Sequence, residues 1–385
     1  MRICFSFSNR SWIKQEAEIL RSSGFIVIAL PMLDLPNPSF PLWLIKNLKS
    51  ILECDIIFKW FAFPAMVFVG KAFGKPTVLN AVGVDVATYP DISYGWPSWW
   101  YARAITSIGL RNADYVLAIS KESKKWAERW GARNVRVIYE GIDTNKFKYR
   151  RKSWNIADKK IVTVAYLGLM NIVRKDFFTL FRALKLVLPV LPGVKLTIVG
   201  EKKDGYPILV KTAEDLGISH AIIFKDFLDF GELLNILYEA SVFVMPSLQE
   251  GFPTALCEAL SCGVPVITTI RPAMNEVFKN RVNALLVEAG NDQKLAEAII
   301  ALLTNKGLAN SIARRGSKMI REKYSKEVRA KNLEEYFAKI AKERLRNGHS
   351  GVNICWLTVF LVLCFVSPLI MLVRSLCEAS KSLIS

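Results

Sequence analysis

A chain of 385 residues, 52% of them hydrophobic, is long enough for two domains and unusually apolar for a purely soluble enzyme. Its 52 basic and 34 acidic residues leave a net charge of +18, which favours phosphates and acidic lipid headgroups as partners. The 7 cysteines form no C-x-x-C pair and there are only 2 histidines, which argues against structural zinc, a disulfide framework and histidine-based metal sites. No zinc-finger, basic-zipper or RNA-recognition pattern is present, so we expect no nucleic acid partner.

Strand-like and helix-like segments alternate along the N-terminal part of the chain. Short runs rich in β-branched and aromatic residues predict strands, at 2–8, 25–30, 55–58, 77–80, 113–119 and 135–139. Amphipathic stretches between them predict helices, at 12–22, 42–52, 65–73 and 121–130. Because strands alternate with helices, we expect a parallel sheet with helices on both faces.

The charged run K-Y-R-R-K-S-W-N-I-A-D-K-K at 148–160 interrupts this alternation, and we interpret it as a solvated linker at a domain boundary. The alternation then resumes with predicted strands at 161–166, 195–199, 221–224, 242–245, 264–267 and 283–287. Predicted helices follow these strands, at 176–188, 232–239, 254–261 and 292–303. The predicted fold class is α/β, with one doubly wound domain over 1–150 and a second over 151–325. In such sheets ligands bind outside the carboxyl ends of the strands.

The most informative stretch is V-F-V-M-P-S-L-Q-E-G-F-P-T-A-L-C-E-A-L-S-C-G-V-P-V at 242–266. It predicts a buried strand, a loop with Pro and Gly, and a helix that Thr254 caps at its start. Loop amides and the first N–H groups of a helix attract anions. Glu250 lies in the loop and Glu258 in the helix, and a carboxylate can accept two hydrogen bonds from a vicinal diol. The stretch indicates a ligand with phosphate and hydroxyl groups, such as a nucleotide sugar; the alternative is an ordinary strand–helix unit with a solvated loop glutamate.

Residues 246–267 closely resemble the Glu-x7-Glu signature of retaining glycosyltransferases with the GT-B fold, in particular glycosyltransferase family 4. The family pattern is P-S-x-x-E-G-F-G-x-x-x-x-E-A-x-A-x-G-x-P-V-I, and Pro253 stands where a glycine is common. Two further segments, 113–143 and 276–287, are also similar to regions of the family. The resemblance covers roughly residues 1–340 and implies two Rossmann-like domains that face a cleft.

The resemblance also implies roles for individual residues in binding a nucleotide-diphosphate sugar. Glu258 is expected to bind the ribose hydroxyls, and Glu250 the transferred sugar, where it would take part in catalysis. Lys175 matches the family's diphosphate-binding lysine and is a second candidate for catalysis. The other implied binding residues are Gly168, Arg174, Gly251, Phe252, Pro253 and Thr254. Family members stabilise the leaving nucleotide with cations and a helix N-terminus, so we expect neither a metal nor a cofactor.

Two departures from the family pattern concern the same site. Leu169 stands where the family commonly has an arginine, so either Arg174 supplies the second positive charge or diphosphate binding is weaker. The first domain contains no histidine, although many family members have one beside the sugar. Asp85 is the best-placed polar substitute and our third catalytic candidate; Asp91 is another, and loop capping is the alternative for Asp85. The family retains anomeric configuration, and the leaving phosphate is thought to deprotonate the acceptor, so no strong protein base is required.

The C-terminal region predicts attachment to a membrane. Residues 326–350 form a basic helix and linker, and the last helix of GT-B proteins usually crosses back to the first domain. Val352–Val373 then carries no charge over 22 residues, which as a helix is about 33 Å long and enough to span a bilayer. We predict a transmembrane helix over 351–373 and a short tail over 374–385, with a buried soluble helix as the alternative. The basic flank predicts that the catalytic domains face the cytoplasm.

Together these observations predict a membrane-attached retaining glycosyltransferase that moves a sugar from a nucleotide-diphosphate sugar to a lipid-linked or membrane-proximal acceptor. The run Y-G-W-P-S-W-W-Y at 94–101 is a second indication of a membrane or acceptor contact, although core packing explains it equally well. Two alternatives stay open: a nucleotide-sugar hydrolase or epimerase with the same fold, and an inert membrane scaffold that retains the fold.

Overall fold

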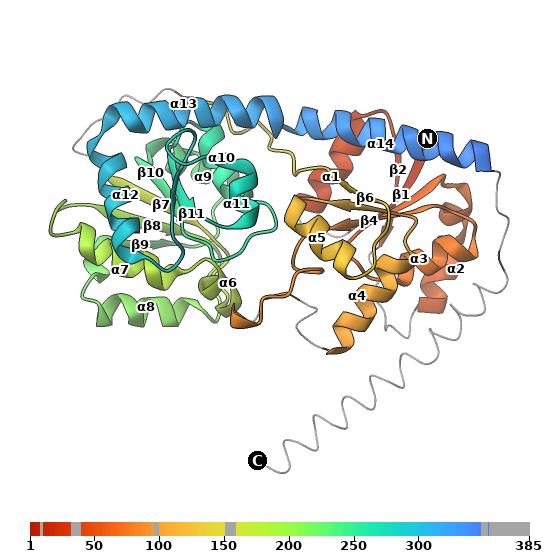
Figure 1. Ribbon diagram of the computed structural model, residues 1–385, viewed down its shortest axis with the longest axis horizontal. Helices are drawn as coiled ribbons and strands as arrows, with labels where there is room; N and C mark the ends of the chain where they lie inside the picture. Colours follow the sequence, from red (N-terminus) through yellow and green to blue (C-terminus); the bar gives the residue numbers. More distant parts are fainter. Residues whose placement is uncertain are drawn as a thin grey trace, which may run out of the picture. The chain divides into compact units, whose positions relative to one another are not determined.

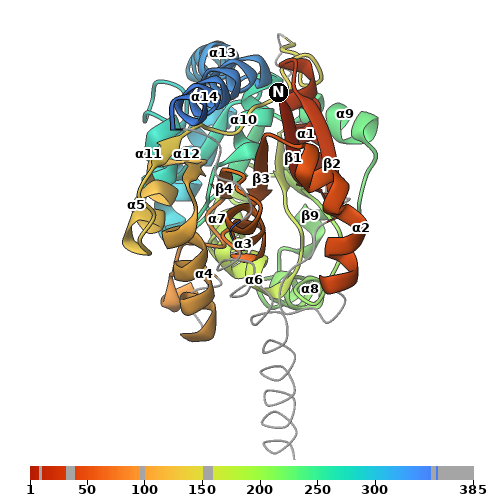
Figure 2. The same ribbon diagram turned by 90° about the vertical axis from the view of Figure 1, so that its right-hand side faces the viewer.

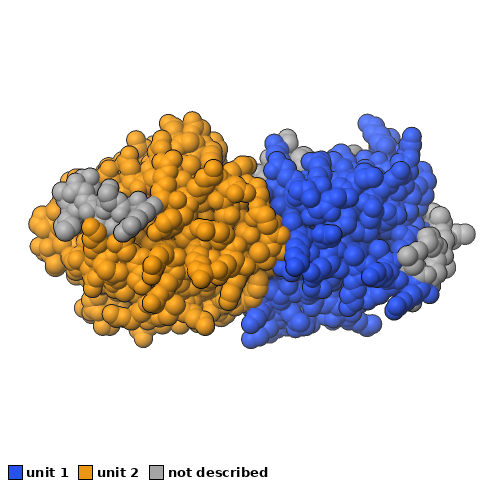
Figure 3. All heavy atoms as spheres, turned by 90° about the horizontal axis from the view of Figure 1, so that it is seen from above, with its two compact units in different colours: residues 1–88, 95–138, 329–385 blue, residues 89–94, 139–328 orange. Residues whose placement is uncertain are grey.

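The computed structural model describes residues 1–7, 11–31, 40–92, 94–95, 100–150, 159–347 and 353. The chain divides into two compact units, which Figure 3 shows in different colours. Unit 1 comprises 1–88, 95–138 and the chain from Arg329 onward, and unit 2 comprises 89–94 and 139–328. After the short segment 89–94, the chain passes from unit 1 into unit 2 at Tyr139. This is earlier in the chain than the predicted domain boundary near residue 150.

Unit 1 is built on a six-stranded parallel sheet in the order β2-β1-β3-β4-β5-β6. Its strands are β1 (Arg2–Phe7), β2 (Ile26–Pro31), β3 (Ile56–Trp60), β4 (Thr77–Ala81), β5 (Tyr115–Ala118) and β6 (Val135–Val137). Its helices are α1 (Ser11–Ser22), α2 (Phe40–Glu53), α3 (Ala65–Ala72), α4 (Trp100–Asn112), α5 (Lys121–Arg129) and most of α14 (Lys326–Asn347). Side chains of α1 and α14 pack on one face of the sheet and those of α2 and α3 on the other. Figure 1 labels these helices on the ribbon of the chain. Every residue of β3 and β4 is buried, as expected for central strands covered on both faces.

Helix α14, the last one within the described ranges, completes the core of unit 1. The ring of Phe337 lies 5.5 Å from that of Phe58 on β3 and 5.6 Å from that of Phe25, both in edge-on geometry. The spacing of its buried residues places them on one helical face, at Leu333, Tyr336, Phe337 and Ile340. The amphipathic pattern of α14 is therefore explained by packing against the N-terminal sheet.

A buried ion pair joins α14 to α1 within unit 1. Arg329 Nε and Nη2 donate to the two carboxylate oxygens of Glu16, at 2.8 and 2.7 Å. Arg329 Nη1 donates to Ile138 O at 3.0 Å, and both charged side chains are only 2% exposed. A bidentate pair with a further backbone acceptor satisfies an arginine that would otherwise be costly to bury.

Unit 2 has a second six-stranded parallel sheet, in the order β12-β11-β10-β7-β8-β9. Its strands are β7 (Lys160–Val164), β8 (Lys195–Val199), β9 (Ile222–Lys225), β10 (Val242–Met245), β11 (Val266–Thr269) and β12 (Leu285–Val287). Its α-helices are α6 (Leu169–Arg174), α7 (Phe177–Val187), α8 (Tyr206–Asp215), α9 (Phe230–Glu239), α10 (Thr254–Ser261), α11 (Pro272–Val277), α12 (Asp292–Thr304) and α13 (Lys306–Lys323), with short 3-10 turns at η1 (Pro90–Ile92) and η3 (Ser219–Ala221). Successive strands run outward from β7 on one side and from β10 on the other. The topological switch point of the sheet therefore lies between β7 and β10.

The two parallel sheets confirm the predicted α/β class with two Rossmann-like units. Several of the described helices have no counterpart among the predicted ones, including α4, α6, α8 and α11. Helices α6 and α11 have only 6 residues each, too few for a helical period to stand out. Helix α4 begins within the W-W-Y run that we interpreted as a possible membrane contact, and the aromatic residues obscured its period.

No helix within the described ranges combines the length and the apolar character needed to cross a bilayer. The predicted span at 351–373 lies outside the described residues except for Asn353, and the predicted tail at 374–385 lies entirely outside them. The C-terminal transmembrane helix therefore stays a prediction from the sequence.

Candidate active site

The predicted site residues of unit 2 lie at the switch point between β7 and β10. The chain leaves β7 and enters α6 through Gly168, the N-cap residue, and Lys175 follows at the C-cap. A second loop, 246–253, follows β10 and leads into α10. Both loops extend from the carboxyl ends of adjacent parallel strands, so their side chains can reach one another.

Glu250 is the centre of a charged cluster. Arg174 Nη1 lies 2.6 Å from Glu250 Oε2, and Lys175 Nζ lies 3.1 Å from Oε1. Ser247 Oγ donates a third hydrogen bond to Oε1, at 2.9 Å. The side chains of Arg174, Lys175 and Glu250 are 13%, 11% and 9% exposed. Charge-assisted hydrogen bonds are strong in such surroundings, so the three charged groups hold one another in place.

The pKa values in this cluster reflect both burial and charge. Burial raises the pKa of Glu250, but the attraction of Arg174 and Lys175 outweighs it and leaves that pKa at about 2. Burial lowers the pKa of Lys175, and Glu250 opposes that shift only in part. Glu250 is therefore ionised at neutral pH, and two cations with one carboxylate leave a net positive charge that attracts anions.

Backbone contacts around α6 position the two cations. Leu248 N–H donates to Arg174 O at 2.7 Å and so joins the two loops. Arg174 also donates to Gln249 O at 2.9 Å and to Asn171 Oδ1 at 3.0 Å. Asp176, the next residue after Lys175, has a left-handed backbone with φ 49° and caps α7. A positive φ is uncommon for residues other than glycine, and such conformations are concentrated at functional sites.

Arg174, and not the residue after Gly168, supplies the second positive charge of the cluster. Leu169 occupies the family's usual arginine position, and its side chain is exposed on the first turn of α6. Its N–H donates to Asp204 Oδ1 at 2.9 Å. The structure thus brings Arg174, Lys175 and Glu250 together, as the sequence suggested, with a neutral residue at position 169.

Glu258 has surroundings opposite to those of Glu250. It lies in α10, half-buried, and no hydrogen bond or ion pair with another described residue engages its carboxylate. Burial alone raises its pKa to about 7. Its acceptor capacity is therefore available to a ligand, and its charge changes near neutral pH.

The loop before α10 differs from the prediction in its cap. Pro253 occupies the N-cap position, and Thr254, predicted as the cap, is the first helical residue, with its N–H bound to Phe252 O at 2.9 Å. Proline has no N–H, so one donor of the family's glycine is lost here. No side chain caps α10, which leaves the amides of its first turn, beyond that of Thr254, to a ligand or to water.

An aromatic cluster that the sequence did not predict supports this loop. The ring of Phe252 lies 6.1 Å from that of Tyr139 and 5.7 Å from that of Tyr324. Tyr139 and Tyr324 contact each other edge-on at 5.2 Å, and the Tyr139 hydroxyl donates to Glu276 Oε2 at 3.2 Å. Phe252 is 6% exposed, so it anchors the loop and is not a free contact for a sugar. Three residues so far apart in the chain carry no local signal of this contact.

Tyr94 is a second site residue that sequence reasoning missed. It belongs to the short segment 89–94, which comes from the N-terminal half of the chain but forms part of unit 2. Backbone hydrogen bonds between Tyr89 and Tyr94, at 2.9 and 3.0 Å, close this segment into a hairpin. The Arg174 guanidinium lies over the Tyr94 ring, 5.6 Å from its centre, and this cation–π contact holds the guanidinium beside Glu250.

Asp85, the third predicted catalytic residue, is fully buried in unit 1. Its carboxylate accepts hydrogen bonds from the backbone N–H groups of Val82 at 2.9 Å and of Gly83 and Ala62 at 3.0 Å. Burial raises its pKa to about 7, although these hydrogen bonds oppose the shift. The geometry favours the loop-capping alternative and gives a catalytic role for Asp85 no support, since none of its side chain is accessible. Asp91 lies in η1 and is exposed.

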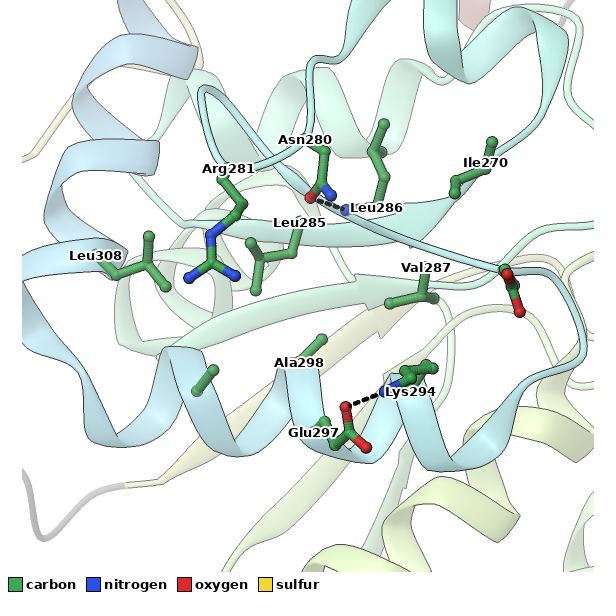
Figure 4. A pocket seen from close by; sticks show the side chains of 12 residues that line it. Ile270, Asn280, Arg281, Leu285, Leu286, Val287, Lys294, Glu297, Ala298 and Leu308 are labelled. Atoms are coloured by element: carbon green, nitrogen blue, oxygen red, sulfur yellow. Dashed lines mark hydrogen bonds and ion pairs between the residues drawn. The ribbon is translucent and has the colours of Figure 1, made fainter.

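A separate hollow of about 430 Å³ lies along the edge strand of unit 2 (Figure 4). It is lined by β12, α12 and the loop around Arg281, and none of the predicted site residues borders it. Lys294 on its wall pairs with Glu297 at 2.9 Å. Within the described ranges no group of three His, Cys, Asp or Glu side chains is placed to hold a metal. The charged cluster at the switch point is therefore the better candidate for the active site.

Two sequence families match this chain. The family described as "Glycosyl transferases group 1" matches residues 147–319, and that described as "Glycosyltransferase Family 4" matches residues 7–146. The first match contains the whole charged cluster and Glu258, and the second contains Asp85. Each family match thus falls mainly on one of the two sheets.

Curated relatives are glycosyltransferases by name. The lipopolysaccharide core biosynthesis glycosyltransferase LpsE of Rhizobium meliloti (strain 1021) is 30% identical over 261 residues, which cover 62% of this chain and 73% of LpsE. A GDP-mannose-dependent alpha-(1-6)-phosphatidylinositol monomannoside mannosyltransferase of Mycobacterium tuberculosis (strain ATCC 25618 / H37Rv) is 25% identical over 338 residues, covering 82% of this chain and 84% of that protein. Across the first six relatives the match spans 54% to 73% of the relative's own length.

Solved structures show the same fold. The crystal structure of Anabaena Alr3699/HepE in complex with UDP and glucose has a TM-score of 0.71 at 18% identity, covering 88% of this chain and 100% of that one. The identity is low, so this likeness carries the fold alone. With two family matches that together span residues 7–146 and 147–319, the chain belongs to the glycosyltransferases with group 1 and family 4 domains on a GT-B fold.

Proposed function

We propose that this glycosyltransferase moves a sugar from a nucleotide-diphosphate sugar to a lipid-linked or membrane-proximal acceptor, with retention of anomeric configuration. The observation that carries the proposal is the cluster of Arg174, Lys175 and Glu250 at the switch point. Its net positive charge attracts a diphosphate, and its two buried cations stabilise the negative charge that develops on the leaving nucleotide. Such preorganised charge does not have to reorient during the reaction.

Lys175 and Arg174 have enough N–H groups to bind Glu250 and the diphosphate at the same time. Lysine carries three N–H donors and arginine five, so each can bind a phosphate oxygen while one donor stays on Glu250. Glu250, ionised and fixed, then accepts hydrogen bonds from hydroxyls of the transferred sugar. Glu258, with its unused acceptors, accepts those of the ribose. The first amides of α10 and the backbone at Gly168 and Gly251 approach the phosphates.

The proposed reaction exchanges one bond at the anomeric carbon on a single face of the sugar. The acceptor oxygen forms its bond from the side on which the bond to the diphosphate oxygen breaks. The departing phosphate oxygen takes the proton of the acceptor hydroxyl. This route needs no protein base, which agrees with the buried, fully hydrogen-bonded carboxylate of Asp85.

Names of similar proteins support the substrate classes. The mycobacterial relative is named for GDP-mannose and a phosphatidylinositol monomannoside, and LpsE for the lipopolysaccharide core. The Anabaena structure contains UDP and glucose. The uncharged run Val352–Val373 and the net charge of +18 support attachment to a membrane with the catalytic units in the cytoplasm. We infer that neither a metal nor a cofactor takes part.

A screen of nucleotide sugars tests the proposal. We expect one donor to raise the unfolding temperature, and we expect that donor to yield a glycosylated lipid when extracted membrane lipids are added. Nuclear magnetic resonance of the product should show the anomeric configuration of the donor. An inverted product would exclude retention, and release of free sugar without transfer to any acceptor would favour the hydrolase alternative.

The raised pKa of Glu258 predicts that donor affinity depends on pH. The ionised carboxylate accepts hydrogen bonds from the ribose, whereas the protonated form loses acceptor capacity. Affinity for a nucleotide-diphosphate sugar, whose phosphates do not titrate near neutrality, should fall as the pH drops below about 7, approaching tenfold per unit. Calorimetric titrations on either side of pH 7 measure this. Glu258→Gln should bind the donor weakly at every pH, whereas the exposed control Glu214→Gln should bind it as the unmodified chain does. If the donor affinity of the unmodified chain does not change with pH, the assignment of Glu258 to the ribose is wrong.

Tyr94 is expected to position Arg174 for the diphosphate. A cation–π contact is worth about 0.5–2 kcal/mol, so Tyr94→Leu should weaken donor binding about 2- to 30-fold. Tyr94→Phe keeps the ring and should bind nearly as the unmodified chain does. Calorimetry with the donor decides between them. If Tyr94→Leu and Tyr94→Phe lose the same affinity, the hydroxyl and not the ring is what matters.

A further inference from the structure

Small side chains opposite β12 leave the hollow of about 430 Å³ along the edge of unit 2. Leu285 and Val287 are two apart on the strand, so both face α12, where they are 6% and 8% exposed. Ala298 and Ala301 line the hollow from one side of α12, and each presents only a methyl group. Helix α13 follows α12 directly (Figure 2) and adds Leu308 to the wall. The hollow thus has an apolar floor and a volume in the range of about 300–1,000 Å³ that is typical of small-molecule sites.

Strand β12 lies at the edge of the sheet, but the hollow beside it does not suit an extended peptide. An edge strand recruits another strand through its outward-facing N–H and C=O groups. Here the N–H of Leu286 already donates to Asn280 Oδ1 at 3.0 Å. A peptide added to β12 would lack this ladder hydrogen bond, and the strand is only 3 residues long. A small molecule that contacts side chains and not the backbone is therefore the better occupant.

The loop before β12 holds an arginine over this floor. Arg281 has a left-handed backbone with φ 58°, which is costly for a residue other than glycine and persists only where the surroundings enforce it. Its N–H donates to Ala284 O at 2.8 Å, and the buried side chain of Asn283 binds Lys279 N–H and Val277 O at 2.6 and 3.2 Å. No hydrogen bond or ion pair with another described residue engages the Arg281 guanidinium. Figure 4 shows this side chain extending from the loop toward α12.

The two ends of the hollow differ in charge. Arg281 comes before β12 and Glu288 directly after it, so these two lining residues border opposite ends. At the Glu288 end, Lys294 pairs with Glu297 at 2.9 Å. Two carboxylates and one ammonium leave that end negative, whereas the Arg281 end has an uncompensated positive charge. A ligand that suits both ends has one negative group at Arg281 and an uncharged chain along the strand.

We propose that this hollow binds an amphipathic molecule with one anionic group, which lies on the Arg281 guanidinium while the apolar chain covers Leu285 and Val287. A guanidinium binds a carboxylate or a phosphate through two parallel N–H groups, and burial of the chain adds a hydrophobic contribution. Three residues of strand span about 10 Å, which sets the length of chain that the floor accommodates. None of the predicted site residues borders the hollow, so this site is separate from the charged cluster.

Calorimetric titration of the full chain with defined probes tests this site. We expect octanoate and octyl phosphate to bind, and the tighter of the two to tell whether the natural ligand ends in a carboxylate or in a phosphate. Octanedioate places a second carboxylate beside Glu288 and should give no measurable heat, and neither should octyltrimethylammonium, which has the opposite charge. If neither anionic probe binds, or if octyltrimethylammonium binds as tightly, the proposal is wrong. The titration needs no sugar donor and no transferase activity, so its failure is distinct from a failure of the proposed function.

Two variants locate the bound probe. Arg281→Asn removes the guanidinium, and asparagine adopts a left-handed backbone readily, so the loop should keep its shape while the anionic probes bind about tenfold more weakly. Ala301→Leu fills the hollow from α12 and should abolish binding, with an unchanged unfolding temperature. The control Lys211→Gln removes a charge from the surface of α8 and should bind the probes as the unmodified chain does. Unchanged affinity in Arg281→Asn or in Ala301→Leu would overturn the proposal.

Discussion

Lys175→Met is expected to reduce kcat about 100- to 1,000-fold and to leave the fold intact. Lys175 Nζ lies 3.1 Å from Glu250 and is one of the two buried cations that we propose to bind the leaving diphosphate. Removing one preorganised donor from a developing oxyanion has an effect of about this size. Burial already lowers the pKa of Lys175, so its charge is costly in the folded state, and methionine fills similar volume without it. Steady-state kinetics with the identified donor, together with thermal unfolding, measure both quantities.

The matched control for this variant is Lys211→Met on the surface of α8. It removes one positive charge from the same unit without touching the cluster, so kcat should not change. A variant Lys175→Met that turns over at the unmodified rate would remove Lys175 from the mechanism. A variant that unfolds at room temperature would show that its charge is structural.

Arg329→Met is expected to lower the free energy of unfolding by about 3–5 kcal/mol. The substitution leaves the carboxylate of Glu16 buried and without its bidentate partner, 2% exposed in the core of unit 1. It also leaves Ile138 O without the donor that lies 3.0 Å away. Urea unfolding followed by tryptophan fluorescence measures the change. In the variant, unit 1 should unfold at a lower urea concentration than unit 2.

A double substitution identifies the cause of this loss. Glu16→Leu with Arg329→Met replaces the whole pair by apolar side chains and should recover most of the stability, because no unpaired charge is left. Lys318→Met breaks an exposed pair with Glu322, at 3.8 Å, and should change little. If Arg329→Met and the double variant are equally unstable, lost packing and not the unpaired charge is the cause.

The cluster around Glu250 could be predicted because its residues carry local signals. A strand, a breaker loop and a helix lie within 242–266, and the same order places Lys175 after β7. In parallel sheets this order fixes which ends of the strands meet. The convergence of the two loops can therefore be predicted without knowing any side-chain contact. The sequence placed Arg174 and Glu250 in the same site, but the ion pair between them was not predicted and is a finding of the structure.

Other parts of the site depend on contacts that no local pattern encodes. Tyr94 reaches Arg174 only because the segment 89–94 forms part of unit 2, and its sequence reads as an ordinary aromatic loop. Phe252 is anchored by Tyr139 and Tyr324, which lie more than a hundred residues away on one side and some seventy on the other. For Asp85 the residue type allowed both a catalytic and a capping role. Only the three backbone donors around its carboxylate distinguish them.

The discontinuous make-up of unit 1 has a consequence for biosynthesis. Its core includes Leu333 and Phe337, whereas the whole of unit 2 lies at or before residue 328. Ribosomes add about 5–20 residues per second, so the N-terminal strands wait many seconds for the helix that covers them. The unit translated first is therefore completed last, and we expect chaperones to bind its uncovered apolar face during that interval. A nascent chain stalled before α14 should be sensitive to protease in its N-terminal part and resistant in 139–328.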